Sequence, residues 1–177
     1  MSPHLDPRHR ISEALDRLDA VLVKRPAFGV DTERSVSTVT NGLRCTSEEG
    51  PWRFETDLPD TMGGEGSGPS PGVLGRAALG SCLAMGYQMR AARLGVPVVS
   101  VRVEIEADYD VAGMLSLQAN ARPGYSEVRY HVHIESDAAD ADILRVLDEA
   151  DRLSPYRDVF GAITPLLRTV SIVATGA

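Results

Sequence analysis

The sequence predicts an α+β fold rather than a doubly wound parallel sheet. Stretches with strand character come first, a long apolar helix lies near the middle of the chain, and further strands and a helix follow it. We see no internal repeat and no second core among the 177 residues. The length therefore suits one compact domain, which we assign to residues 31–177, preceded by an N-terminal extension at residues 1–30.

The extension is expected to contain one amphipathic helix between His9 and Lys24. Its apolar residues recur at helical spacing, and charged residues fill most of the positions between them. Pro26 ends the helix. Because an apolar stripe must be covered, we expect this helix to rest on the main domain or on a second subunit.

An antiparallel meander is expected next. Residues 34–40 and 43–46 are rich in Val and Thr, residues 48–51 suit a turn, and residues 52–57 alternate between apolar and polar side chains. The following loop, residues 59–71, is rich in glycine and proline, which indicates a special backbone geometry before the next element.

The central element is a helix over residues 72–94. Ser70 and Pro71 form a helix start, because serine can cap free N–H groups and proline suits the first turn, and Gly95 forms a stop. Apolar side chains lie on nearly every side, so we expect a buried helix. It is too short and carries too many arginines to span a membrane.

The second half of the chain alternates between strands and helices, with a break at Ser154-Pro155. We expect strands at residues 99–109, 114–119, 127–135 and 167–174, a helix at 137–153 and a short helix at 157–163.

Composition and charge exclude several classes of protein. The formal net charge of -7 argues against nucleic-acid binding and against docking on anionic membranes. Two cysteines do not make a disulfide framework, and the polar N-terminus lacks the apolar core of a signal peptide. We therefore expect a cytoplasmic protein with reduced thiols and with no nucleic-acid or membrane partner.

Cys82 is the leading candidate for chemistry. A cysteine inside an apolar helix commonly serves as a small hydrophobe, which is the simpler interpretation. Gly80 and Ser81 can interrupt the helix, however, and Cys82 would then lie near a helix N-terminus, where a thiolate is stabilised. Cys45 is interpreted mainly as a buried strand residue, with the alternative that it approaches Cys82 closely enough to bridge.

No metal site and no cofactor are expected. His131 and His133 share one face of a strand, but a third ligand is missing nearby, so solvent exposure is favoured over metal binding. The sequence has no phosphate-binding loop, no nucleophile elbow and no zinc-protease motif.

Five short motifs are distinctive, namely Asp57-Leu58-Pro59, Gly63-Gly64, Pro69-Ser70-Pro71, the run from Ala77 to Cys82, and Leu94-Gly95-Val96. Together they resemble the OsmC/Ohr family of osmotically inducible and organic-hydroperoxide-resistance proteins, over residues 34–174. The resemblance implies an OsmC-like fold, with antiparallel sheets wrapped around a long buried central helix. It also implies an intertwined homodimer with active sites at the subunit interface, and we expect the N-terminal helix to cap this dimer.

The resemblance further implies roles for single residues. In the active peroxidases of the family, a cysteine on the central helix attacks the hydroperoxide and a second cysteine, after the later helix, resolves the product. An arginine and a glutamate lower the pKa of the attacking thiol. Cys82 matches the attacking cysteine, but Ser154 stands at the second-cysteine position and Gly72 stands where the glutamate is expected. The arginine has no unambiguous match, and Arg44 and Arg34 are the two candidates.

Two functions are compatible with these residues. The first, which the resemblance favours, is a thiol-dependent peroxidase that reduces organic hydroperoxides or hydrogen peroxide in oxidative stress defence. Cys82 would be its nucleophile, with an external thiol or, alternatively, Cys45 resolving the oxidised sulfur. Leu79, Leu83 and Met85 would line its substrate pocket. The second is a non-catalytic protein of the same fold that binds a small apolar or thiol-reactive ligand at the dimer interface.

Overall fold

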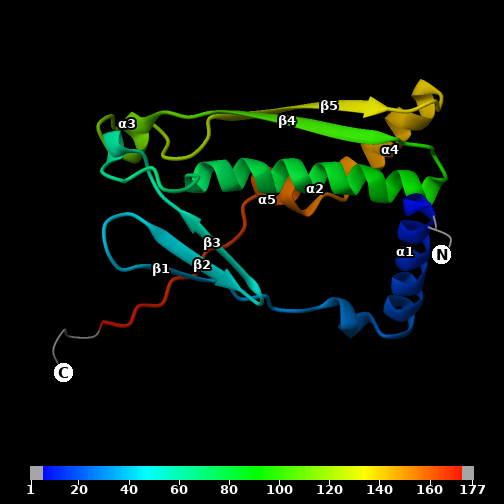
Figure 1. The fold of residues 1–177 in the computed structure, drawn as a ribbon, viewed down its shortest axis with the longest axis horizontal. Helices are drawn as coiled ribbons and strands as arrows, with labels where there is room; N and C mark the ends of the chain where they lie inside the picture. Colours follow the sequence, from blue (N-terminus) through cyan, green and yellow to red (C-terminus); the bar gives the residue numbers. More distant parts are fainter. Residues whose placement is uncertain (1–5, 173–177) are drawn as a thin grey trace.

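The computed structural model describes residues 6–172 and consists of helices packed on one side of a two-stranded sheet, with a separate three-stranded sheet (Figure 1). The elements are α1 (Pro7–Lys24), β1 (Val36–Val39), β2 (Cys45–Glu49), β3 (Trp52–Thr56), α2 (Pro71–Leu94), β4 (Ser100–Asp108), α3 (Val111–Met114), β5 (Glu127–Glu135), α4 (Asp140–Arg152) and α5 (Pro155–Gly161). Two short 3₁₀ turns, Pro26–Gly29 and Asp60–Met62, lie in the connections. No helix among the described residues is long and apolar enough to cross a membrane.

The core forms where α2 lies against the sheet of β4 and β5. Leu79, Leu83, Tyr87 and Ala91 recur every four residues, so they form one stripe along α2, and all four are buried. The inward side chains of both strands pack on this stripe, and α4 closes the layer from the side with Val146 and Ala150. Figure 1 shows β4 and β5 running the length of α2, which is why one long helix can be covered along most of one face.

The two ends of α2 are fixed by local sequence. Pro71 occupies the first turn, and Gly95 ends the helix in the left-handed region, with φ 67°. Because residues that carry a side chain rarely adopt this backbone conformation, glycine suits the position. The predicted bounds of the central helix therefore agree with the structure to within one residue.

The loop before α2 is organised by one carboxylate. Asp57 is 2% exposed and accepts hydrogen bonds from the backbone N–H groups of Leu58, Glu65 and Ser67 and from the Ser67 hydroxyl, at 2.8–3.1 Å. These donors, those of Ser67 above all, hold the pKa of Asp57 at about 2. Gly64 lies so close to the Leu58 carbonyl that no side chain fits there. The glycine-rich segment is thus a fixed turn that sets where α2 begins.

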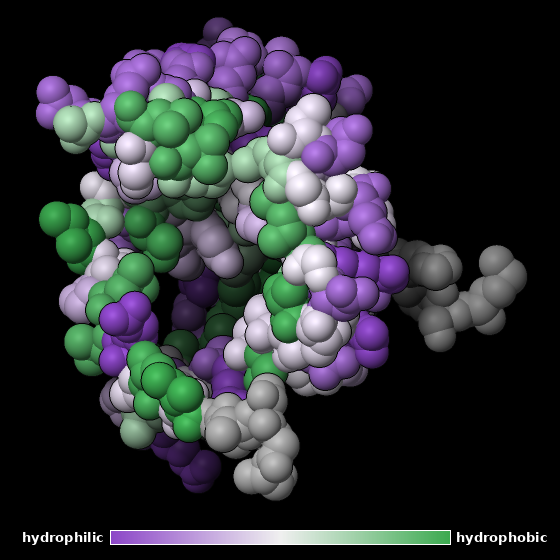
Figure 2. Space-filling view, turned by 90° about the vertical axis from the view of Figure 1, so that its left-hand side faces the viewer, coloured by the Kyte–Doolittle hydropathy of each residue, from purple (hydrophilic) through white to green (hydrophobic). Residues whose placement is uncertain are grey.

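The N-terminal strands form a sheet of order β1-β2-β3, which diverges from α2 in Figure 1. Exposed apolar side chains on it include Val36, Val39, Trp52 and Phe54. Figure 2 shows apolar side chains on both sides of a hollow in this face of the molecule. A substantial apolar surface of the single chain is therefore left uncovered.

One expected turn and two expected strands are wrong. Strand β2 continues to Glu49, because Glu48 pairs with Arg53 and Glu49 with Trp52, so the turn is confined to Gly50 and Pro51. Residues 114–119 form no strand: the short helix α3 ends at Met114, and residues 115–119 are irregular. Asp110 starts α3, because its side chain accepts from the Ala112 N–H at 2.8 Å.

The expected closing strand is also absent from the described part of the chain. Residues 162–172 have no strand pairing, and Ile163, Leu166, Leu167 and Ile172 are each more than nine-tenths exposed. Residues 173–174 of that expected strand lie outside the described residues. A strand forms only against a partner strand, and this segment has none within residues 6–172.

Candidate functional site: a thiol pocket on the central helix

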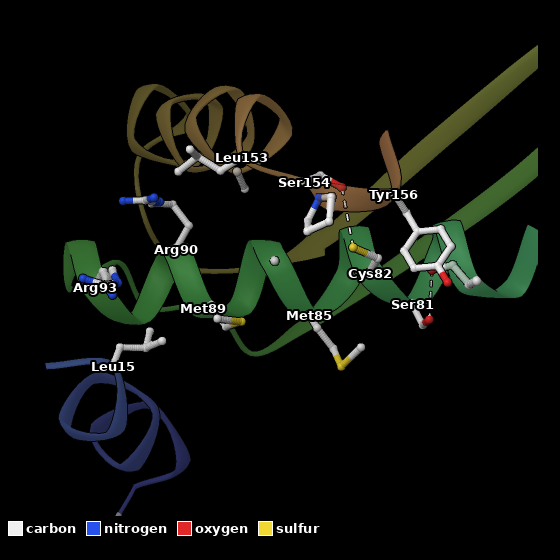
Figure 3. A pocket seen from close by; sticks show the side chains of 14 residues that line it. Leu15, Ser81, Cys82, Met85, Met89, Arg90, Arg93, Leu153, Ser154 and Tyr156 are labelled. Carbon is white, nitrogen blue, oxygen red and sulfur yellow. Dashed lines mark hydrogen bonds between the residues drawn. The ribbon is translucent and has the colours of Figure 1, made fainter. Parts of the chain in front are cut away.

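A pocket of about 900 Å³ lies along the face of α2 that turns away from the sheet (Figure 3). The floor is α2, from Ala78 to Arg93. The junction of α4 and α5, from Leu153 to Tyr156, forms one wall, and Leu15 of α1 closes the far end. Most of the lining is apolar, so the pocket suits an apolar ligand.

Cys82 and Ser154 face each other at one end of this pocket. The Cys82 sulfur lies 3.6 Å from the Ser154 hydroxyl oxygen, within hydrogen-bond reach for sulfur. Cys82 is half-buried and Ser154 is 7% exposed. The structure therefore brings together the predicted nucleophile and the residue at the second-cysteine position, which are 72 positions apart in sequence.

Ser154 is held in place by its role as the N-cap of α5. Its hydroxyl oxygen accepts a hydrogen bond from the Arg157 N–H at 3.3 Å, and Pro155 occupies the first turn of α5. The hydroxyl can accept from Arg157 while it donates to the Cys82 sulfur, because a serine oxygen carries one proton and two lone pairs. Its orientation is thus fixed from both sides.

A partly buried polar network anchors the chain just before Ser154. Asp151, at the end of α4, accepts hydrogen bonds from the hydroxyls of Tyr87 and Tyr130, each at 2.6 Å. Arg157 donates to the backbone carbonyl of Asp151 at 3.4 Å. Burial raises the pKa of Tyr87 and of Tyr130, and the hydrogen bonds to Asp151 raise both further. The network joins α2, β5 and α4, and so fixes the α4–α5 junction relative to Cys82.

The predicted arginines and the second cysteine lie elsewhere in the chain. Arg44 is bound to Glu55 on the N-terminal sheet, with Nη2 2.5 Å from the carboxylate. Arg34 is exposed in the segment before β1, and Cys45 lies half-buried on β2, with its sulfur 3.8 Å from the Thr46 carbonyl. None of these three residues lines the pocket.

Of the three apolar residues expected around the substrate, only Met85 lines the pocket. Leu79 and Leu83 lie instead in the core against β4 and β5, at 3% and 1% exposure. The reason is helical geometry: residues 79, 83 and 87 form the stripe that the sheet covers, whereas Cys82, Met85 and Met89 lie on a neighbouring stripe.

Two arginines of the pocket were not anticipated from the sequence. Arg90 lies 3.4 Å from the Glu149 carboxylate, and Arg93 donates to both oxygens of Asp19 on α1, one of these bonds at 2.9 Å. The bond to Arg93 lowers the pKa of Asp19. The sequence could have indicated both residues, because Arg90 and Arg93 follow Cys82 by eight and eleven positions, and residues at these spacings share a face of a helix.

At the start of α2, position 72 carries glycine instead of the expected glutamate, and other side chains lie beside it. The Tyr125 hydroxyl donates to the Gly72 carbonyl at 3.2 Å and accepts from Arg76 at 3.1 Å. A Cβ atom at position 72 would lie 3.3 Å from this hydroxyl and 3.4 Å from Arg76. The space beside Gly72 is therefore occupied by Tyr125 and Arg76.

His131 and His133 lie on the exposed face of the β4–β5 sheet, as the alternation predicted. Their rings are 4.6 Å apart, and His133 lies 3.6 Å from the Glu104 carboxylate. Within residues 6–172 there is no group of three or more His, Cys, Asp or Glu side chains placed to hold a metal ion.

The fold and the pocket define an α+β protein whose central helix presents a thiol beside the start of a later helix. The model of the family described as OsmC-like protein matches residues 64–166, more than half of the chain. The chain belongs to the OsmC-like family, which confirms the family and the fold class predicted from the sequence.

Solved structures support the same fold. An OsmC-like protein from Mycoplasma pneumoniae aligns with a TM-score of 0.65 and 12% identity, over 75% of this chain and 89% of that one. An organic hydroperoxide resistance protein OsmC from Legionella pneumophila aligns with a TM-score of 0.56 and 17% identity, over 75% and 90%. A putative osmotic stress induced and detoxification response protein from Psychrobacter arcticus aligns with a TM-score of 0.58 and 18% identity, over 78% and 93%. A search of curated proteins finds no match.

Proposed function

We propose that this protein is a thiol-dependent peroxidase that reduces organic hydroperoxides or hydrogen peroxide in oxidative stress defence, with Cys82 as the nucleophile. The observation that carries the proposal is the Cys82 sulfur at the end of an apolar pocket, 3.6 Å from a hydroxyl that can donate to it. The Ser154 hydroxyl is also held by the N–H of Arg157, so it faces the sulfur in one orientation. Family membership and the name of the Legionella neighbour agree with this chemistry.

The first step consumes the peroxide. The Cys82 thiolate attacks the oxygen that carries the hydrogen, the O–O bond breaks, and the other oxygen leaves as alkoxide or hydroxide, which takes a proton from water to become an alcohol or water. Cys82 is then a sulfenic acid. In this step the sulfur is oxidised by two electrons and the peroxide is reduced by two.

The second step uses an external thiol, because Ser154 offers no sulfur and Cys45 does not line the pocket. A small-molecule thiol condenses with the sulfenic acid, water leaves, and a mixed disulfide forms; a second thiol then attacks this disulfide and frees Cys82. Ser154 therefore lies where a resolving cysteine would lie, but it cannot form a disulfide.

We further propose that the active unit is a cytoplasmic homodimer. The apolar surface of β1–β3 and of the exposed Met85 and Met89 is of the kind that a second copy would cover. In such a dimer the partner's N-terminal sheet would bring an arginine, the counterpart of Arg44 or Arg34, towards Cys82.

The deciding experiment is intact-protein mass spectrometry after brief exposure to one equivalent of an organic hydroperoxide. A gain of one oxygen that Cys82→Ser abolishes and Cys45→Ser retains supports the single-cysteine peroxidase. Loss of two hydrogens within one chain would instead assign Cys45 as the resolving cysteine. Peroxide consumption with the same rate in Cys82→Ser and in the parent would overturn the proposal.

The alternative is a non-catalytic protein that binds a small apolar or thiol-reactive ligand in the same pocket. It is favoured by one observation: both arginines of the pocket are already paired with carboxylates, and Gly72 brings no carboxylate towards the thiol. An unchanged mass after peroxide treatment would support this alternative.

A further inference from the structure

A second pocket lies beyond the thiol pocket, between the start of β5, the later part of α5 and Leu79 of α2. Its volume is about 520 Å³, which is within the range of pockets that bind small molecules. The thiol pocket reaches as far as Tyr156 of α5, whereas the second pocket begins at Arg157. Among residues 6–172, no residue lines both pockets, so the second pocket is a separate site.

Two arginines without carboxylate partners line this second pocket, namely Arg122 and Arg157. Within residues 6–172, no carboxylate oxygen lies within 4.0 Å of either guanidinium group. In the thiol pocket, by contrast, Arg90 and Arg93 are both paired with carboxylates. Carboxylates are in excess in this chain, whose net charge is -7. Because guanidinium groups bind carboxylates and other oxyanions well, two unpaired ones in a single pocket favour an anionic ligand.

Both arginines are positioned by contacts that exist without a ligand. Arg157 donates from Nη1 to the backbone carbonyl of Asp151 at 3.4 Å, and its other guanidinium N–H groups remain available. The backbone at Arg122 packs against the buried Gly113 of α3, where a Cβ atom would overlap the Arg122 carbonyl. Binding of an anion would therefore cost little reorganisation of the chain.

The rest of the lining is largely apolar and includes an aromatic wall. The rings of Tyr125 and Phe160 are stacked, with centroids 6.3 Å apart and an angle of 11° between their planes. The Tyr125 ring is held by its hydroxyl, which donates to the Gly72 carbonyl and accepts from Arg76. A fixed aromatic wall suits a ligand with a flat apolar body.

The charge of the lining indicates which anion fits. Glu127 also lines the second pocket, and its carboxylate accepts a hydrogen bond from Arg129 at 2.8 Å. Two guanidinium groups and one carboxylate leave the lining with a net charge of plus one. A carboxylate ligand, with a single negative charge, matches this lining, whereas the second charge of a phosphate dianion would be repelled by Glu127.

We propose that the second pocket binds a small organic carboxylate with a flat apolar body, whose carboxylate is held by Arg122 and Arg157 and whose body packs against Tyr125 and Phe160. This inference goes beyond the proposed peroxidase, because binding here involves neither a thiol nor a peroxide. Failure of the peroxidase proposal would therefore leave it intact.

The test is isothermal titration calorimetry on the full chain with naphthoate and with naphthamide, its neutral analogue of similar shape. The parent should bind naphthoate at least about tenfold more tightly, because the amide cannot form the charge-assisted hydrogen bonds to both arginines. Arg122→Gln and Arg157→Gln should each weaken naphthoate binding by about tenfold and leave the affinity for naphthamide close to that of the parent. The matched control is Arg152→Gln, which changes the net charge equally at an exposed arginine of α4 that lines neither pocket.

Three results would overturn the proposal: no binding of naphthoate to the parent at millimolar concentration, equal affinities for naphthoate and naphthamide, or equal losses in Arg122→Gln and Arg152→Gln. Arg157→Gln removes a hydrogen bond to Asp151, so its folding is checked by circular dichroism. If that variant fails to fold, Arg122→Gln decides alone, and unchanged naphthoate binding in it refutes the proposal.

Discussion

Ser154→Cys tests the geometry of the site directly, because a thiol at position 154 would lie next to the Cys82 thiol. The two side chains already approach to 3.6 Å, and a carbon–sulfur bond is longer than a carbon–oxygen bond, so the sulfurs would come closer still. We expect the variant to form an internal disulfide under a mild oxidant. With an organic hydroperoxide, it should lose two hydrogens where the parent gains one oxygen.

The size of the stability change can be worked out from the structure. The bridge joins residues 72 positions apart, and closing a loop of that length restricts the unfolded chain by about 4 kcal/mol. The variant also loses the Ser154 cap on α5, which costs about 1 kcal/mol. The oxidised variant should therefore be more stable than the parent by roughly 3 kcal/mol, a rise in Tm of about 6–12 °C for a chain of this length.

The assay compares melting curves of oxidised and reduced protein, with thiol titration to count free cysteines. Ser154→Ala is the matched control, since it removes the cap and adds no sulfur; it should melt slightly below the parent in both conditions. Persistence of three free thiols in Ser154→Cys after oxidation, in a protein that is folded by circular dichroism, would show that residues 82 and 154 do not face each other in solution.

Three further predictions concern the scaffold. Gly64→Ala should lower the free energy of unfolding by about 1–3 kcal/mol in urea titrations, because its methyl group would overlap a main-chain carbonyl, whereas Gly124→Ala, in open space, should change it little. Asp57 has a pKa of about 2 against 3.8 unfolded, so its stabilisation is present above pH 4 and is lost as the pH falls towards 2. In Asp57→Asn, the free energy of unfolding should therefore decrease less between pH 4 and pH 2 than in the parent. Burial raises the pKa of Tyr87 above its unfolded value, so stability should fall as the pH rises past 10. In pH-dependent unfolding experiments, Tyr87→Phe should reduce that fall. The same variant should lower the free energy of unfolding by about 1–3 kcal/mol at neutral pH, because the hydrogen bond to Asp151 is lost.

Much of the fold could be predicted because its signals are local. Pro71 and Gly95 mark the ends of α2 by their own conformational preferences, and the alternation along residues 99–109 and 127–135 matches β4 and β5 closely. The bounds of β2 were predicted less well, since Glu48 and Glu49 favour a turn locally but pair with Arg53 and Trp52 across the strand.

The site could be predicted only in part, because its geometry depends on contacts distant in sequence. Cys82 was singled out by its place in the apolar helix and Ser154 through the family pattern, and the structure brings them together. Which leucines face the pocket depends on how α2 is rotated against the sheet, so Leu79 and Leu83 were misplaced. The contribution of Leu15 depends on where α1 docks, which no local pattern specifies.

The uncovered N-terminal sheet has a consequence for how the molecule responds to dilution. Among the described elements, α1, β4, α4 and α5 pack on α2, whereas β1–β3 pack chiefly on one another. A small sheet that leaves Trp52 and Phe54 exposed gains little by folding alone. If a second copy covers it, its folding is linked to association by mass action, and its apparent melting temperature rises with protein concentration. The sheet would then unfold at low concentration before the layer around α2, whose core is complete within one chain.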